Sequence, residues 1–308
     1  MRAAVVGLGN MGPGIAATLA RGGIDAVCYD AKPERRERAR REMPVLFETL
    51  HSIGDRVLPK QGEIRFSDDL GGSVRDVDIV IEAMPERVEI KHTIFAALDR
   101  LAPAAAILAS TTAGISITRL QEACVHKGRV LGMRWSHPPH VMPLVEVIAG
   151  EHTDPATMAT VRAIATNLGL TPVEVRRDVP GFVHNRLLYA LLRESLALIE
   201  KGVIAPEELD RCVKAGLGLE LAVSGPMELL DSIGLDQYQA LAGVLNSDLE
   251  AGSGVAGFVA SRSATGALGM KAGSGVYRYS VEQVAALRSE RSAKRIAMRK
   301  LLASSSHD

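Results

Sequence analysis

The sequence lacks the cysteine pattern of a disulfide-rich or metal-binding protein and the basic excess of a nucleic-acid-binding protein. Its 308 residues include three cysteines, Cys28, Cys124 and Cys212, which lie far apart and show no metal-ligand spacing. Lys and Arg together number 36, as do Asp and Glu, so the formal net charge is zero. Because nucleic-acid binding requires an excess of basic residues, we expect no nucleic-acid partner, and likewise no metal and no disulfide framework.

Long apolar runs are also absent. No stretch approaches the roughly 18 residues that a membrane-spanning helix needs, so no membrane partner is expected. The chain starts directly with a strand-like run, which leaves no room for a signal peptide. Hydrophobic residues make up 47% of the chain, an ordinary share that excludes wholesale disorder. These features together predict a soluble cytoplasmic protein.

Residues 1–177 alternate short apolar runs with longer stretches of helical spacing. Such alternation is typical of βαβ units, and hence of a mostly parallel sheet with helices on both faces. The predicted strands are 3–7, 26–29, 63–66, 78–81, 106–109, 130–133, 143–149 and 171–175. The predicted helices among them are 11–20, 33–52, 87–101 and 155–168.

The pattern changes after residue 178, where no β-branched runs follow and apolar residues recur every three or four positions. Pro180-Gly181 marks the hinge at which this half begins. Its predicted helices are 182–201, 206–213, 227–233, 235–245 and 281–302. We therefore predict an α/β fold, with an N-terminal Rossmann-type doubly wound, mostly parallel sheet over 1–177 and an all-helical C-terminal domain over 178–308.

A glycine-rich turn links the first predicted strand to the first predicted helix. It reads Gly7-Leu8-Gly9-Asn10-Met11-Gly12. In this context the GxGxxG spacing is typical of dinucleotide binding: its glycines allow a tight turn, close approach of a pyrophosphate and close helix packing. The pyrophosphate would bind free N–H groups at the helix N-terminus. We predict that all six residues bind the cofactor.

Asp30 ends the second predicted strand, where a carboxylate would bind the adenosine ribose hydroxyls and repel a 2′-phosphate. NAD is therefore favoured over NADP, although Lys32 and Arg35 weaken the preference. The helix that follows is rich in arginine and is interpreted either as a phosphate-binding surface or, preferably, as a solvated face with paired acids. Its arginines are Arg35, Arg36, Arg38, Arg40 and Arg41.

Further motifs follow in order along nearly the whole chain. They are Val80-Ile81-Glu82-Ala83 with Pro85-Glu86 and Lys91, Pro143-Leu144-Val145-Glu146-Val147, Asp178-Val179-Pro180-Gly181-Phe182-Val183-His184-Asn185-Arg186, Gly225-Pro226 with Asp231, Gly234-Leu235-Asp236, and Gly269–Tyr279. Together with the glycine turn, they resemble the 3-hydroxyacyl-CoA dehydrogenase family. The resemblance implies NAD as the cofactor, hydride transfer at a hydroxy or oxo group, and a homodimer formed through the helical domain.

The resemblance also implies roles for single residues. The family's glutamate and lysine that match Glu86 and Lys91 contact the nicotinamide half of the cofactor, and Lys271 lies in the closing lysine-glycine segment. Glu146 matches the catalytic glutamate, and Asn185 matches the active-site asparagine. These matches make Glu86, Lys91 and Lys271 expected cofactor ligands, and Glu146 and Asn185 expected catalytic residues.

Three central positions depart from the family pattern. The family's base histidine is replaced by Arg134, the asparagine three residues later by His137, and the active-site serine by Ala113. Arginine cannot act as a base, because its pKa stays above about 12. Arg134 can instead clamp a carboxylate or phosphate, or stabilise negative charge that develops on a carbonyl oxygen.

An imidazole remains the natural proton carrier near neutral pH. His137 is the leading candidate, with Glu146 supporting it, and His140 in the same loop is the second. The alternative role of His137 is to bond the cofactor amide.

Trp135-Ser136-His137-Pro138-Pro139-His140 and Met11-Gly12-Pro13-Gly14 resemble a narrower branch of the family. That branch contains an NAD-dependent dehydrogenase of vitamin B6 breakdown, whose substrate is a small carboxylated pyridine without CoA. We therefore predict an NAD-dependent dehydrogenase or reductase for a small hydroxy, oxo or imino compound bearing a carboxylate. The alternatives are a true 3-hydroxyacyl-CoA dehydrogenase and a non-catalytic NAD-binding protein.

Overall fold

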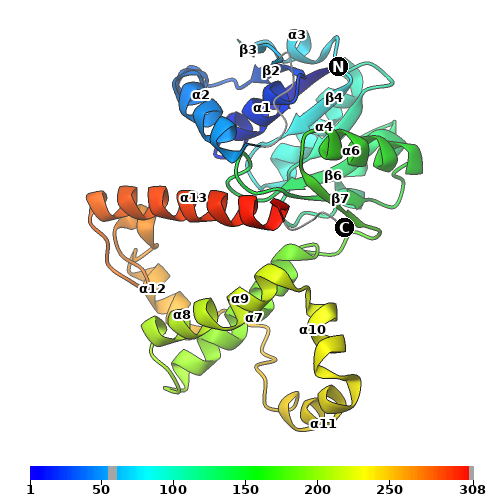
Figure 1. Cartoon of the computed structure of the whole chain (residues 1–308). Helices are drawn as coiled ribbons and strands as arrows, with labels where there is room; N and C mark the ends of the chain where they lie inside the picture. Colours follow the sequence, from blue (N-terminus) through cyan, green and yellow to red (C-terminus); the bar gives the residue numbers. More distant parts are fainter. Residues whose placement is uncertain (55–60, 305–308) are drawn as a thin grey trace. The chain divides into compact units, whose positions relative to one another are not determined.

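The computed structural model describes residues 1–54 and 61–304, which divide into two compact units. The first unit consists of Met1–Asn185 and Lys294–Ser304, and the second of Arg186–Ala293. Figure 1 shows the elements of both units along the chain. The glycine turn and Asp30, which predict nucleotide binding, both lie in the first unit.

The first unit is built on one sheet with the strand order β3-β2-β1-β4-β5-β6-β7-β8. The strands are β1 (Arg2–Val6), β2 (Asp25–Tyr29), β3 (Ile64–Ser67), β4 (Ile79–Glu82), β5 (Ile107–Ser110), β6 (Val130–Trp135), β7 (Leu144–Ala149) and β8 (Thr171–Val175). Neighbouring strands are parallel except β6 and β7. The connection between those two is too short for a parallel crossover, which needs a dozen or more residues. The predicted mostly parallel sheet is confirmed.

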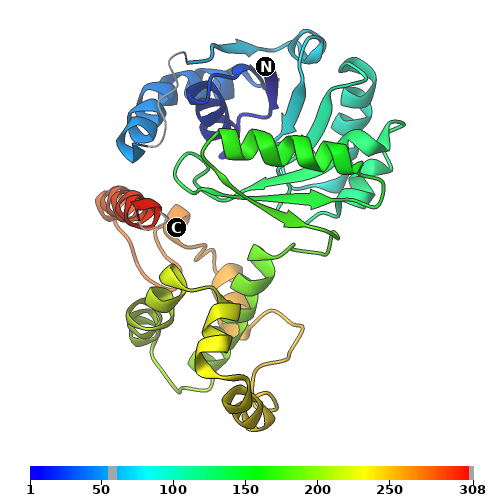
Figure 2. The same ribbon diagram turned by 45° about the vertical axis from the view of Figure 1, so that its right-hand side comes forward.

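Helices cover both faces of this sheet (Figures 1 and 2). One layer contains α1 (Gly12–Arg21), α2 (Pro33–Ile53) and α6 (Pro155–Asn167), and the other α3 (Leu70–Val74), α4 (Val88–Leu101) and α5 (Ile117–Gln121). Ile15 and Val161 belong to the core on the first face, and Phe95 and Leu120 to the core on the second. Two buried faces explain why the central strands read as continuous apolar runs.

The strand order reverses between β1 and β4, and this switch point is where doubly wound sheets bind ligands. The glycine turn follows β1, Glu82 ends β4, and Ser110 ends β5. Because β1, β4, β5 and β6 run in parallel, their carboxyl ends share one edge of the sheet. The edge that carries the predicted site is therefore the one where a dinucleotide binds in this architecture.

The second unit is helical, as predicted. Its elements are most of α7 (His184–Glu200), α8 (Pro206–Ala215), α9 (Leu217–Val223), α10 (Pro226–Ile233), α11 (Leu235–Leu245), α12 (Gly257–Ala264) and the first part of α13 (Val281–Ser304). Isolated bridges join Gly269 to Ser274 and Ser274 to Arg278. The short helices α3, α5, α9 and α12 were not predicted, because so few turns carry little periodicity. Across residues 1–54 and 61–304, no helix combines the length and apolar content of a membrane span.

The packing of the first unit's core predicts how a cavity there would change the free energy of unfolding. Phe95 of α4 is fully buried in the core on the second face of the sheet, so Phe95→Ala should lower the free energy of unfolding by about 3–5 kcal/mol. The chain's one tryptophan, Trp135, is 3% exposed in the same unit, so its fluorescence reports urea unfolding of that unit. Val125→Ala is the control, since Val125 is 85% exposed. Equal unfolding midpoints for the two variants would contradict the packing.

Candidate active site

The backbone of the glycine turn has the features of a pyrophosphate cradle. Gly7 has a φ of 104°, and a Cβ there would lie 2.7 Å from the Ala83 carbonyl oxygen. A Cβ on Gly12 would collide with the carbonyl of Gly7, whereas one on Gly9 would meet nothing within 4 Å. No side chain caps the N-terminus of α1 at Met11. The turn therefore offers open space and uncapped N–H groups to an anion, which fits a dinucleotide.

Asp30 is held beside this turn at the end of β2. It is 4% exposed, and its Oδ2 accepts the N–H of Leu8 at 2.9 Å while its Oδ1 accepts the N–H of Lys32 at 3.0 Å. The guanidinium of Arg35 lies 3.5 Å from Oδ2. The predicted ribose-binding carboxylate is thus in register with the turn.

The arginines of α2 divide into two groups. Arg38 donates to the carbonyl oxygens of Leu8 and Gly9 at 2.8 and 3.0 Å, and Arg36 donates to that of Asp30 at 2.6 Å. These two side chains fold back onto the nucleotide edge. Arg40 instead pairs with Glu37 on the exposed surface, as expected of a solvated helix face.

A buried polar cluster closes the ends of β4 and β5. The Lys91 Nζ lies 2.7 and 2.8 Å from the two carboxylate oxygens of Glu82, and the Ser110 hydroxyl donates to Glu82 at 2.6 Å. All three residues are fully buried. In this structure Lys91, expected at the nicotinamide half, therefore serves as the counterion of Glu82. Glu82 was noted from the sequence only as part of a motif, because its pairing depends on the fold.

Glu86 organises the loop that follows β5. Its Oε1 accepts the Thr112 hydroxyl at 2.6 Å and the N–H groups of Ala113 and Gly114 at 2.9 and 3.0 Å. Its Oε2 lies 3.7 Å from the Lys91 Nζ, and its side chain is 41% exposed. Glu86 thus links the Lys91 cluster to the loop carrying Ala113, the residue at the family's serine position.

Arg134 and Glu146 face each other across the antiparallel pair of β6 and β7. The Arg134 Nη1 lies 2.8 Å from the Glu146 Oε2, and the two side chains are 10% and 2% exposed. The Arg134 Nη2 donates to the Asn185 Oδ1 at 2.8 Å, and the Asn185 amide donates to the Ala113 carbonyl at 2.9 Å. The structure therefore joins three of the four predicted catalytic residues in one network.

Glu146 also binds the start of α7. Its Oε1 accepts the backbone N–H groups of Val183 and His184 at 2.9 and 3.1 Å. Its carboxylate thus compensates the charge of Arg134 and positions the segment that presents Asn185. Glu146 was predicted to support His137, but the contacts described here join it to Arg134 and to the start of α7.

His137 and His140, the two predicted proton carriers, differ in their exposure. His137 is exposed just after β6, and His140, in the same loop, packs against Gly14 of α1 with its Nδ1 buried. Burial lowers the pKa of His140, and the nearby His137 lowers it further. At neutral pH His140 is therefore an uncharged imidazole.

His184 was not singled out from the sequence. It is half-buried at the first residue of α7, and its pKa is lowered by burial and by the charge of Arg134, against an opposing effect of Glu146. Its position directly before Asn185 in the sequence motif was the signal that could have identified it. Lys271 is exposed and belongs to the second unit, whereas the other predicted site residues belong to the first.

The strand order, glycine turn and buried acid define a dinucleotide-binding dehydrogenase fold, and comparison with known proteins specifies it. Residues 2–179 match the model of the 3-hydroxyacyl-CoA dehydrogenase NAD-binding domain, and residues 181–279 that of its C-terminal domain. The chain therefore belongs to the 3-hydroxyacyl-CoA dehydrogenase family. Its cofactor is NAD.

The chain is similar to particular members of this family in sequence and in structure. The chain is 48% identical over 301 residues, or 97% of both chains, to 5-formyl-3-hydroxy-2-methylpyridine 4-carboxylate 5-dehydrogenase of Mesorhizobium japonicum. The crystal structure of an enzyme of that name, described as an NAD+-dependent dismutase, matches with a TM-score of 0.95 and 47% identity over 98% of both chains. A probable 3-hydroxybutyryl-CoA dehydrogenase of Deinococcus radiodurans is 36% identical over 91% of this chain and 100% of its own. The chain is thus an NAD-dependent oxidoreductase acting on a hydroxyl or carbonyl group.

The burial of the Arg134–Glu146 pair predicts that removing one partner lowers the free energy of unfolding. Because Arg134→Met leaves a buried carboxylate without its cation, it should lower the free energy of unfolding by about 3–5 kcal/mol. The measurement is urea unfolding at pH 7, followed by Trp135 fluorescence. Arg162→Met is the matched control, because Arg162 lies 2.7 Å from Glu174 but is 51% exposed. An exposed pair contributes less than about 1 kcal/mol, so similar losses in both variants would contradict the assignment.

Proposed function

We propose that the enzyme oxidises or reduces a small hydroxy, oxo or imino compound that bears a carboxylate and carries no CoA. The observation that supports this most directly is the network of Arg134, Glu146 and Asn185 at the substrate end of the site, where an arginine stands in place of the family's base. The relative that is 48% identical acts, by its name, on a pyridine carrying a formyl group and a carboxylate. Similarity over 97% of both chains supports a substrate of that class.

The cofactor-binding roles follow from the positions of the residues. The backbone of Gly7, Leu8, Gly9, Asn10, Met11 and Gly12 would hold the pyrophosphate, and Asp30 the adenosine ribose. Glu86 and Lys91 would support the nicotinamide half, and Lys271 is proposed as a further cofactor ligand. Bound NAD supplies the acceptor for the hydride.

The chain's own residues then handle the oxygen and the proton. In oxidation, the hydroxyl proton of the substrate passes to the imidazole of His137, and the remaining N–H groups of Arg134 stabilise the negative charge that develops on the oxygen. Asn185 orients the guanidinium, and Glu146 holds it in place. His140 is the second candidate for the proton, since its lowered pKa keeps it uncharged. In reduction the proton moves in the opposite direction.

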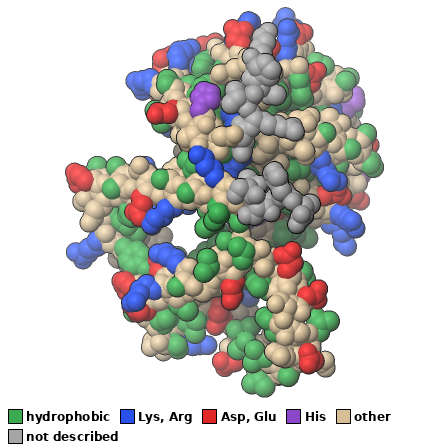
Figure 3. Space-filling view, in the orientation of Figure 1, with side chains coloured by type: hydrophobic (Ala, Val, Ile, Leu, Met, Phe, Trp, Pro, Cys, Tyr) green, Lys and Arg blue, Asp and Glu red, His purple; other side chains and the backbone are tan. Residues whose placement is uncertain are grey.

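We also propose that the helical part forms a homodimer. Among the described residues from Arg186 to Ala293, Ala197 is the only one that is buried. Apolar side chains are spread over the surface of these helices in Figure 3, and those on α10 and α11 that are more than half exposed include Met227, Ile233, Leu235, Tyr238, Leu241 and Val244. A second copy of the chain would bury this surface, which otherwise provides little to offset the loss of chain entropy.

The remaining assignments are of domains and location. We propose 1–177 as the NAD-binding domain and 178–308 as the helical substrate and dimerisation domain. A cytoplasmic location agrees with the three cysteines, none of which forms a disulfide.

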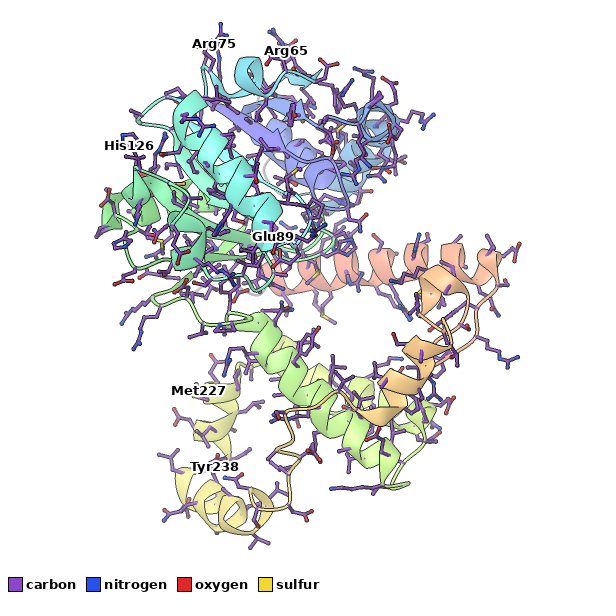
Figure 4. All side chains as sticks on the ribbon, turned by 180° about the vertical axis from the view of Figure 1, so that it is seen from behind. Arg65, Arg75, Glu89, His126, Met227 and Tyr238 are labelled. Atoms are coloured by element: carbon purple, nitrogen blue, oxygen red, sulfur yellow. The ribbon has the colours of Figure 1, made fainter. Side chains whose placement is uncertain are left out.

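The proposed activity can be tested by following NADH absorbance with purified protein, NAD and a substrate panel. The panel compares small aromatic hydroxymethyl and formyl carboxylates with 3-hydroxybutyryl-CoA. We expect turnover of the free carboxylates, and a loss of about 100-fold or more in kcat for His137→Ala, the size of a general-base contribution. His126→Ala is the control, because His126 lies on the exposed surface of the same unit (Figure 4).

The other outcomes would exclude the proposal or part of it. Turnover of the thioester alone would favour ordinary 3-hydroxyacyl-CoA oxidation. Binding of NAD without turnover of any panel member would favour the non-catalytic alternative. Full activity in His137→Ala would move proton transfer to His140.

The proposed dimer can be tested by sedimentation equilibrium. We expect the mass of two chains, and a monomer for Leu241→Asp, since Leu241 is 63% exposed on α11, the helix that carries Tyr238 (labelled in Figure 4). Val45→Asp is the matched control, because Val45 is 64% exposed in the first unit and should leave the dimer intact. A monomeric wild-type protein would refute the interface.

A further inference from the structure

Arg134 keeps N–H donors that can bind an anion, but its pairing with Glu146 leaves the two residues without net positive charge. Glu146 accepts from one guanidinium nitrogen of Arg134 at 2.8 Å, and Asn185 from the other, also at 2.8 Å. The carboxylate therefore balances the positive charge of the arginine. An anionic substrate bound by Arg134 would lie near Glu146, so the site needs a second cation to hold it well.

His184 belongs to the segment that Glu146 holds, and its imidazole can supply that cation. Its backbone N–H donates to the Glu146 Oε1 at 3.1 Å, and the next residue in the chain is Asn185, which binds Arg134. The imidazole is half-buried, and its ring nitrogens have no hydrogen-bond partner among residues 1–54 and 61–304. The charged groups that act on it are Arg134 of β6 and Glu146 of β7.

The state of this imidazole depends on what lies beside it. In the free protein, burial and Arg134 lower the pKa of His184, so the ring is neutral at neutral pH. A carboxylate placed beside the ring would favour the charged form and raise its pKa. The ring can therefore gain a proton when an anion binds and remain neutral when none is present.

We propose that His184 is a carboxylate-binding residue of the active site, which takes up a proton as the acidic group of the substrate binds between it and Arg134. The inference rests on the proposed function, because it assigns the substrate's carboxylate to a particular pair of residues. His184 thereby determines specificity for acidic substrates. Proton transfer at the reacting oxygen stays with the loop that follows β6.

The direction of the pH dependence follows from linkage. Below the lowered pKa of the free protein, His184 is charged before and after binding, so affinity for the carboxylate is highest. As pH rises from that value to the raised pKa of the complex, binding requires proton uptake and affinity falls. The KM for an ionised carboxylate should therefore rise with pH across this interval and level off above it.

The experiment compares wild type with His184→Asn and His184→Gln in steady-state assays across pH. The probe is 5-formyl-3-hydroxy-2-methylpyridine 4-carboxylate, and the matched neutral probe is its 4-carboxamide. We expect the variants to raise KM for the carboxylate by about tenfold or more at the acid end, the effect of losing one charge-assisted hydrogen bond. Their KM should lose its pH dependence, kcat should change far less, and KM for the carboxamide should stay the same.

His152→Asn is the control variant, because His152 is exposed in the turn after β7, and it should behave as wild type. Equal KM values for the carboxylate in wild type and both His184 variants would overturn the proposal. A fall in kcat at unchanged KM would also overturn it, since His184 would then be a proton carrier in the chemical step.

A binding measurement separates failure of this proposal from failure of the proposed function. Pyridine-4-carboxylate is titrated into the NADH complex by calorimetry in two buffers of different ionisation enthalpy, which reports protons taken up without turnover. We expect uptake in wild type and none in His184→Asn. Equal proton uptake in the two proteins would refute the role of His184 even if the enzyme turns over every acid in the panel. Uptake confined to wild type would support it even if no probe is turned over.

Discussion

The candidate active site depends on one buried ion pair, between Arg134 and Glu146. It is possible because β6 and β7 are antiparallel, which places the two residues directly opposite each other. A lone buried charge at either position would be costly, so each residue requires the other. The pair also determines the positions of its neighbours, since Arg134 holds the side chain of Asn185 and Glu146 holds the backbone at the start of α7.

A second buried ion pair, between Glu82 and Lys91, lies at the end of β4 on the nucleotide edge of the sheet. Ser110 and the loop held by Glu86 connect it to Ala113, whose carbonyl accepts the amide of Asn185. One hydrogen-bonded path thus runs from the end of β4 to Arg134. Because each polar group on this path is satisfied by another, one network positions the edge proposed to bind NAD together with the end proposed to bind substrate.

The two units obtain their stability in different ways. The sheet of the first unit is buried on both faces, with Ile15 in one core and Phe95 in the other. Between Arg186 and Ala293, Ala197 is the only described residue that is buried, although the apolar content of these helices is high. Most of the sheet unit is therefore specified by its own packing, while the helical unit calls for further contacts, and a homodimer is the proposal that meets this requirement.

The sequence by itself determined the alternation of strands and helices, the glycine turn and the acid at Asp30, and it led to the expectation that Arg134 replaces the family's base. Each of these is local, because periodicity and turn chemistry depend on neighbouring residues. It did not determine that Lys91 neutralises Glu82, that Arg134 is balanced by Glu146, or that the backbone of His184 binds Glu146. Those facts depend on strand register and on the entry of α7, which bring together residues far apart in the chain, so only the tertiary structure decided them.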